Sequence, residues 1–155
     1  MAFGTSSKIF TATITDVMNN TTAFDCNSDT FKAAIYGNSG TPDQTVASAS
    51  AAYNAGQWTT GNEVSNGGWS AAGLTLASVT STFSSNVWTF DAADSANGSA
   101  ATITDSRGLL IYDDTLTTPV ADQALCYLAF GGLVAVTAGT LTAQYNASGI
   151  AALTL

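Results

Sequence analysis

The chain has 155 residues, enough for one domain whose core needs neither a disulfide nor a metal. Its residues are 46% hydrophobic, which excludes disorder through low hydrophobicity, and only 9% charged, against about 25% in typical soluble proteins. The net charge of −8, with three basic side chains, excludes nucleic acid and anionic membrane surfaces as expected partners. The surface must then consist mainly of Thr, Ser, Asn, Gly and Ala. Such a surface suits either permanent contact with neighbouring proteins or a secreted-type β domain.

No apolar stretch reaches the roughly 20 residues needed to span a bilayer, and the first residues turn polar too early for a secretory signal. We therefore expect a soluble protein made in the cytoplasm. In that compartment Cys26 and Cys126 are expected to be reduced thiols. We expect residues 1–155 to form a single domain.

The N-terminal part fits two structures. Phe10, Ile14, Val17 and Met18 have helical spacing, which predicts a short amphipathic helix ending at the polar run 19–22. Residues 10–15 also alternate like a strand, and their threonines favour β structure. We expect the helix.

Residues 30–36 alternate cleanly and predict a strand, followed by a turn over 37–42. Residues 46–54 are rich in alanine and serine and predict one or two helical turns. The glycine density of 56–68, with Gly73 just beyond, predicts an extended loop.

The remaining chain predicts short strands separated by turns. We expect one long strand or a bent pair over 74–83, a hairpin link at 84–86, and strands at 87–90, 109–112, 141–145 and 150–155. The apolar run 124–136 is interrupted by glycines and predicts two strands. The expected fold is mainly β: one sandwich-like domain of about eight strands, with a short N-terminal helix or arm.

The alternating positions also predict a shared core. Its members are Phe31, Ile35, Leu74, Leu76, Phe90, Leu109, Ile111, Leu125, Leu128 and Leu141.

The sequence offers little for catalysis. It contains no histidine, which removes the commonest general base and the commonest metal ligand. Two carboxylate pairs remain, Asp91 with Asp94 and Asp113 with Asp114, and a glycan-cleaving enzyme would need such a pair across a cleft. Turn or helix caps explain Asp91 and Asp94 better, and calcium binding is a second alternative. We assign no catalytic, cofactor-binding or metal-binding residue, and we do not expect an enzyme.

Trp58 and Trp69 flank the glycine-rich segment. Tryptophan is enriched at protein interfaces, so the two are candidate interface anchors. Tryptophans that cap the end of a sandwich core are an equally good interpretation.

A resemblance adds to this interpretation. Several motifs, in this order along residues 28–155, are similar to those of small bacteriophage virion structural proteins: Ser28-Asp29-Thr30-Phe31-Lys32-Ala33-Ala34-Ile35-Tyr36, Thr41-Pro42-Asp43, Asn62-Glu63-Val64, Gly73-Leu74-Thr75-Leu76, Phe90-Asp91-Ala92-Ala93-Asp94, Arg107 to Asp114 and Tyr145 to Ile150. The resemblance implies a structural protein of the virion that contacts other copies of itself and the major capsid protein or other virion proteins. Capsid decoration is the specific expectation. A tail-associated or receptor- or carbohydrate-binding fibre module is the alternative.

Overall fold

The computed structural model, which describes residues 6–66 and 68–155, is mainly β with one short helix near the N-terminus. In chain order the elements are β1 (Lys8–Ile9), α1 (Thr11–Met18), β2 (Phe31–Tyr36), the 3₁₀ turn η1 (Ser48–Ser50), β3 (Leu74–Thr75), β4 (Thr80–Ser84), β5 (Val87–Asp91), β6 (Ser95–Ala96), β7 (Ala101–Asp113), β8 (Ala124–Gly139), β9 (Thr142–Ala143) and β10 (Ala151–Thr154). The predicted fold class, a mainly β sandwich-like domain with an N-terminal helix, is confirmed.

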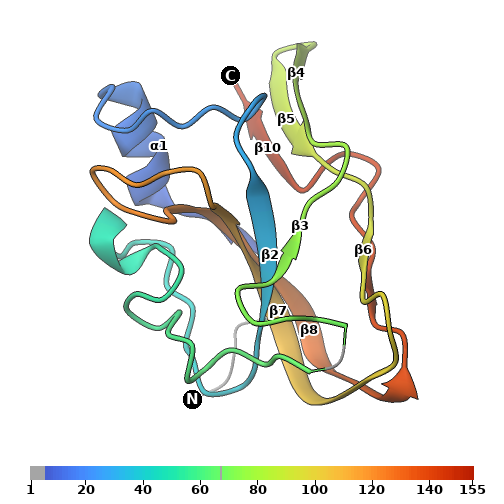
Figure 1. The fold of residues 1–155 in the computed structure, drawn as a ribbon. Helices are drawn as coiled ribbons and strands as arrows, with labels where there is room; N and C mark the ends of the chain where they lie inside the picture. Colours follow the sequence, from blue (N-terminus) through green and yellow to red (C-terminus); the bar gives the residue numbers. More distant parts are fainter. Residues whose placement is uncertain (1–5, 67) are drawn as a thin grey trace.

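The centre of the molecule is a five-stranded antiparallel sheet in the order β1-β8-β7-β2-β3. Figure 1 shows α1 and η1 on one side of this sheet and β4, β5, β10 and β6 on the other. Four consecutive residues of β7, Leu109 to Tyr112, are fully buried because the sheet is covered on both faces. Leu109 and Ile111 face one hydrophobic cluster, and Leu110 and Tyr112 face the other.

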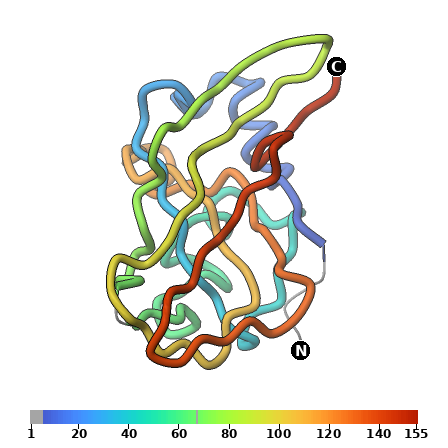
Figure 2. The backbone as a smooth tube through the Cα atoms, turned by 90° about the vertical axis from the view of Figure 1, so that its right-hand side faces the viewer, coloured from blue at the N-terminus to red at the C-terminus, as the bar shows by residue number. Residues whose placement is uncertain are grey.

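The second layer consists of a three-stranded sheet, β10-β5-β4, with the short pair β6-β9. In Figure 2 the red C-terminal segment runs along the face turned toward the viewer, from the lower end of the molecule to the upper end. The rings of Phe31 in β2 and Phe90 in β5 meet at a centroid distance of 4.8 Å. This contact joins the two layers through the main core.

The predicted core is confirmed. All ten residues belong to the main cluster: eight are buried, while Leu74 and Leu128 are partly buried and packed against it. The period-2 pattern therefore identified the residues that hold the layers together.

The helix is where the sequence predicts it, but its buried side is different. Thr13 is buried and donates its hydroxyl to the carbonyl of Ala124 at 2.6 Å. Val17 and Met18, expected on the buried side, are 43% and 79% exposed. The predicted short helix and its end before residues 19–22 are therefore confirmed, and Phe10 of the spaced set is buried, but Val17 and Met18 do not pack on the sheet, where the Thr13 hydroxyl makes a buried hydrogen bond instead.

The apolar run 124–136 was expected to form two strands, and this is also wrong. It belongs to the single strand β8, which pairs with β7 over nearly its whole length. Gly108 pairs with Ala129, whereas Ser106 pairs with Val134, so β8 contains extra residues between these two pairs and forms a bulge. Gly131, at φ +75°, lies in this bulge. The glycines bend the strand and do not end it.

A second bulge changes one side-chain direction. Simple alternation places Leu125 with Tyr127 and Ala129, opposite Cys126. In the structure Ile111 pairs with Cys126 and Tyr112 with Ala124, so Leu125 is the extra residue. Leu125 and Cys126 consequently both lie in the main core.

The segment 74–83 forms the bent pair of the two alternatives. Ser78, at φ +54°, lies between β3 in the central sheet and β4 in the second sheet. The hairpin link at 84–86 is confirmed, with Ser85 and Asn86 both at positive φ. No helix among residues 6–66 and 68–155 is long and apolar enough to cross a membrane.

Candidate interaction surface

The two tryptophans are buried on opposite sides of the central sheet. Trp58 contacts the rings of Phe10 at 6.0 Å and Tyr36 at 5.0 Å, and its carbonyl accepts the Tyr36 hydroxyl. Trp69 is fully buried in the main core, and its indole N–H donates to the carbonyl of Ala33 at 3.2 Å. Of the two interpretations, burial in a core is the one that the structure shows. Neither indole presents a surface to a partner.

The carboxylate pairs are not arranged across a cleft. Asp94 is exposed and accepts the backbone N–H of Tyr145 at 2.9 Å, which joins two distant segments and is not the predicted helix or turn cap. Asp113 is fully buried, whereas its neighbour Asp114 is exposed and forms an ion pair with Lys32 at 2.8 Å. Within the described part of the chain, no three Cys, Asp or Glu side chains are placed to hold a metal ion.

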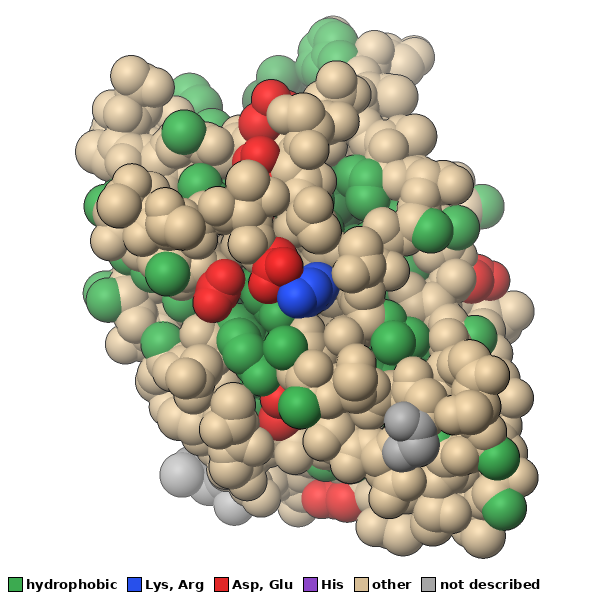
Figure 3. Space-filling view, in the orientation of Figure 1, with side chains coloured by type: hydrophobic (Ala, Val, Ile, Leu, Met, Phe, Trp, Pro, Cys, Tyr) green, Lys and Arg blue, Asp and Glu red, His purple; other side chains and the backbone are tan. Residues whose placement is uncertain are grey.

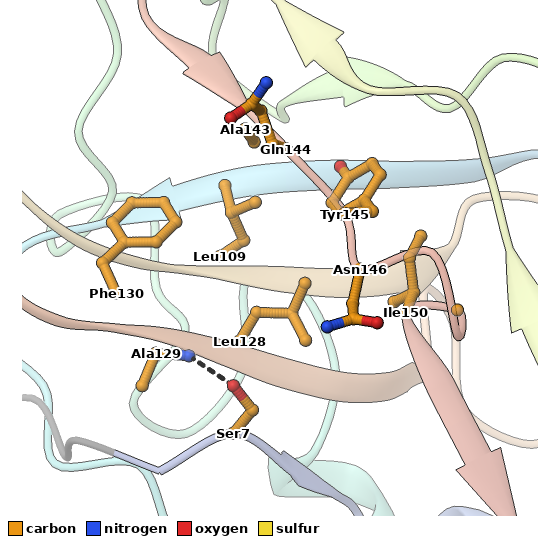
Figure 4. A pocket seen from close by; sticks show the side chains of 11 residues that line it. Ser7, Leu109, Leu128, Ala129, Phe130, Ala143, Gln144, Tyr145, Asn146 and Ile150 are labelled. Carbon is orange, nitrogen blue, oxygen red and sulfur yellow. Dashed lines mark hydrogen bonds between the residues drawn. The ribbon is translucent and has the colours of Figure 1, made fainter.

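A groove opens along the side of the sandwich where β8 faces the segment between β9 and β10. Figure 4 shows its larger part, a cavity of about 250 Å³ with apolar side chains at its base. Leu109 comes from β7, Leu128 and Phe130 from β8, and Tyr145 and Ile150 from the C-terminal segment. The cavity is smaller than typical ligand sites, which measure about 300–1,000 Å³.

A second cavity of about 190 Å³ shares Ser7, Leu128 and Ile150 with the first and continues past Lys8 and Ile9. We call the two together the edge groove. Its walls are edge strands, because β1 has only two residues and β10 lies at the edge of the second sheet. The groove therefore lies on the open side of the sandwich. Because five separate segments of the chain line it, the sequence alone could not predict it.

The lining of the edge groove carries almost no charge. Among the residues that the structure describes, no acidic side chain lines either cavity, and Lys8 is the one basic residue in the lining. Burial raises the pKa of Tyr145 to about 12, so its hydroxyl stays neutral and shares a hydrogen bond with Ser95 at 3.0 Å. Charge cannot select a ligand here, and shape and apolar contact must do so.

The strand beside the groove has an open edge. β1 pairs only with Cys126 and Tyr127 of β8, and the Ala129 N–H donates to the Ser7 hydroxyl. Beyond that point, no strand in the described ranges pairs with the outer edge of β8. Leu133 is 53% exposed on this part of the strand.

A row of apolar side chains crosses the second sheet. Phe83 pairs with Trp88, and Trp88 pairs with Leu153, so the three lie on one face. Phe83 is 60% exposed and Leu153 is also exposed. We call these three residues the apolar row. Figures 1 and 2 show the hairpin β4–β5 and the C-terminus together at the upper end of the molecule.

Comparison with protein-family models, with curated proteins and with solved structures finds no match to this chain. The similarity to phage virion proteins therefore remains a hypothesis. The candidate surface rests on the geometry and charge of this chain alone.

Proposed function

We propose that this protein is a structural subunit that assembles with other copies and with other virion proteins through uncharged strand edges. One observation carries the proposal: no charged side chain occurs from Gln123 to Leu155, the stretch that supplies β8, β9, β10 and most of the edge groove. All eleven acidic residues lie earlier in the chain.

An open strand edge is a site for pairing with another chain, since its backbone N–H and C=O groups lack partners. Monomeric proteins usually protect such edges with charges, prolines or covering segments. The outer half of β8 carries neither a charge nor a proline. An extended strand from a neighbouring subunit would gain backbone hydrogen bonds there and could place alternate side chains in the edge groove.

The rest of the surface favours the same role. Figure 3 shows few charged side chains on the face seen in Figure 1: a small group of acidic and basic side chains lies near its centre, and most of the remaining face is uncharged. The apolar row adds a further surface that water solvates poorly. Subunits with three cations each cannot be held together mainly by salt bridges, so apolar burial and hydrogen bonds must supply the attraction.

Among structural roles, we propose decoration of a phage capsid. A decoration protein adds many repeated contacts to a closed shell without changing it, and symmetric copies of a small domain do this. The proposal also draws on the ordered motifs that resemble phage virion proteins. It includes no catalytic activity and no cofactor.

Counting copies on purified particles tests this role. We expect the protein to remain on intact particles in numbers comparable to the shell subunit, because decoration follows the shell lattice. Quantitative mass spectrometry of particles, with tail-less heads as the matched sample, measures the ratio. A few copies that stay with the tail fraction would favour the fibre module instead. A protein missing from washed particles would contradict a virion role altogether.

A further inference from the structure

A buried carboxylate at the end of β7 lacks a partner for one of its oxygens. Asp113 is fully buried, and its Oδ1 accepts the N–H groups of Thr115 at 2.8 Å and Leu116 at 3.3 Å. Its Oδ2 has no hydrogen-bond donor among the described residues. An unsatisfied buried carboxylate oxygen is costly, so its surroundings need an explanation.

The carboxyl group of Asp29 lies beside Asp113, because Phe31 of β2, two residues further along the chain, pairs with Asp113, and Asp29 is one of the groups that raise the pKa of Asp113. Asp29 is held in place, because its Oδ2 accepts the N–H of Asp25 at 2.8 Å and its own N–H donates to the Asp25 carbonyl at 3.0 Å. The two loops are also joined beside the pair. Thr30 N–H donates to the Thr115 hydroxyl at 2.8 Å, and Asp114 N–H donates to the Thr30 carbonyl at 2.8 Å.

Two ionised carboxylates in contact cannot hydrogen-bond, because both are acceptors only. One added proton turns one of them into a donor and removes the repulsion. Burial is the largest cause that raises the pKa of Asp113, and the hydrogen bond with Asp29 is the next; together with the opposing N–H groups of Thr115 and Leu116 they bring this pKa from 3.8 to about 7. Oδ2 of Asp113 therefore lacks a hydrogen-bond partner only while both carboxyl groups are ionised.

Within residues 6–66 and 68–155, no cation forms an ion pair with Asp29 or Asp113. Lys32, on the strand paired with this end of β7, is engaged by Asp114 at 2.8 Å. The other titratable groups around the pair are acidic or neutral: Asp25 and Cys26 on the same loop as Asp29, Cys126 on β8, and Asp16 on α1 across Gln123. Burial, with Asp113 and the other acids of its loop, raises the pKa of Cys26 to about 12, so it stays a neutral thiol.

We propose that Asp29 and Asp113 together form a proton-binding site that fastens the loop 24–30 to the end of β7. When the proton leaves, the two charges repel and the fastening weakens. The loop carries Phe24, whose ring lies 5.4 Å from that of Phe31 in the main core. The site therefore gives the subunit a pH-dependent stability that is separate from its assembly surface.

The sign of the effect follows from the direction of the shift. Asp113 binds its proton more tightly in the folded chain than in the unfolded chain. Its contribution to stability is complete below pH 3.8 and is lost as the pH rises through about 7. Each unit of pKa shift changes the unfolding equilibrium constant by about tenfold.

The variant Asp113→Asn tests the site. The amide keeps an oxygen for the N–H groups of Thr115 and Leu116, and its NH₂ replaces the shared proton at every pH. We expect the unfolding midpoint of the unaltered protein to fall from mildly acidic to mildly alkaline buffer. Asp113→Asn should lose most of that fall and be the more stable protein in alkaline buffer. The control Asp114→Asn removes an exposed neighbouring carboxylate and should show the same fall as the unaltered protein. Burial also raises the pKa of Asp122 and Glu63, so these two groups account for the part of the fall that remains in Asp113→Asn.

An assigned carboxyl carbon NMR titration of the unaltered protein gives a second readout that does not depend on the variant folding. The Asp113 carboxyl should titrate far above the usual aspartate range, and its titration should perturb Asp29. Normal titration of Asp113, or the same pH dependence in Asp113→Asn as in the unaltered protein, would refute the site. Ca²⁺ is a further control. If it restores the alkaline stability of the unaltered protein but not of Asp113→Asn, the pair binds a cation, and the proposal of a proton-binding site is wrong. None of these outcomes bears on assembly, so the two proposals fail separately.

Discussion

Replacing Gly73 by alanine should destabilise the protein severely. Gly73 has φ +78°, and a Cβ atom there would lie 2.3 Å from the carbonyl oxygen of Ala33. That carbonyl also accepts the Trp69 indole N–H, and Ala33 pairs with Leu74 at the sheet edge. Left-handed strain in a residue other than glycine and overpacking against backbone together cost about 2–6 kcal/mol. Because domains are stable by only about 5–15 kcal/mol, this is a large share of the total.

Chemical denaturation measures the change, with Gly61→Ala as the control. Gly61 has no heavy atom within 4 Å of a built Cβ and no positive φ, so its substitution should be nearly neutral. Equal stability of Gly73→Ala and the unaltered protein would mean that the edge formed by β2 and β3 is not packed as described.

Trp69→Ala should cost about 3–5 kcal/mol, the usual range for a fully buried tryptophan. The loss combines the cavity left by the indole with the broken hydrogen bond to Ala33. Phe83→Ala, in the exposed apolar row, should change the stability of the monomer by no more than about 0.5 kcal/mol. Thermal unfolding of dilute protein compares the two.

This pair of variants also separates the two interpretations of the tryptophan. An interface anchor would weaken assembly when removed and leave the monomer as stable as before. If Trp69→Ala unfolds normally while association is lost, the residue acts between chains, and its burial in the core is not what matters.

The strand core could be predicted because alternating residues such as Phe31 and Ile35 report directly which face of a strand is buried. The structure departs from the predicted alternation where a β-bulge adds a residue to one strand of a pair. Leu125 changes sides at a bulge that only its partner strand creates, and Gly131 bends β8 without ending it. For α1, a threonine hydroxyl makes a buried hydrogen bond to the sheet, and hydrophobic spacing cannot indicate that.

The surfaces of interest were less accessible to sequence reasoning. The edge groove is assembled from Ser7 at one end of the chain and Ile150 at the other. The sequence places Asp113 beside Asp114, whereas the proposed proton-binding pair joins it to Asp29, far away in the sequence. The sequence also holds a signal that strand alternation does not bring out, namely that no charged side chain follows Asp122. That uncharged stretch contains the open edge of β8.

Sedimentation of the protein across a salt series tests the central claim most directly, with Leu133→Glu and Thr60→Glu measured beside it. Copies at −8 repel one another, and salt screens charges beyond about 10 Å at 0.1 M. If uncharged edges hold the copies together, association should persist or strengthen as salt rises. Leu133→Glu should weaken it, and Thr60→Glu, in the exposed glycine-rich loop, should not. Dissociation of the unaltered protein by moderate salt would contradict the account, as would a protein that stays monomeric throughout.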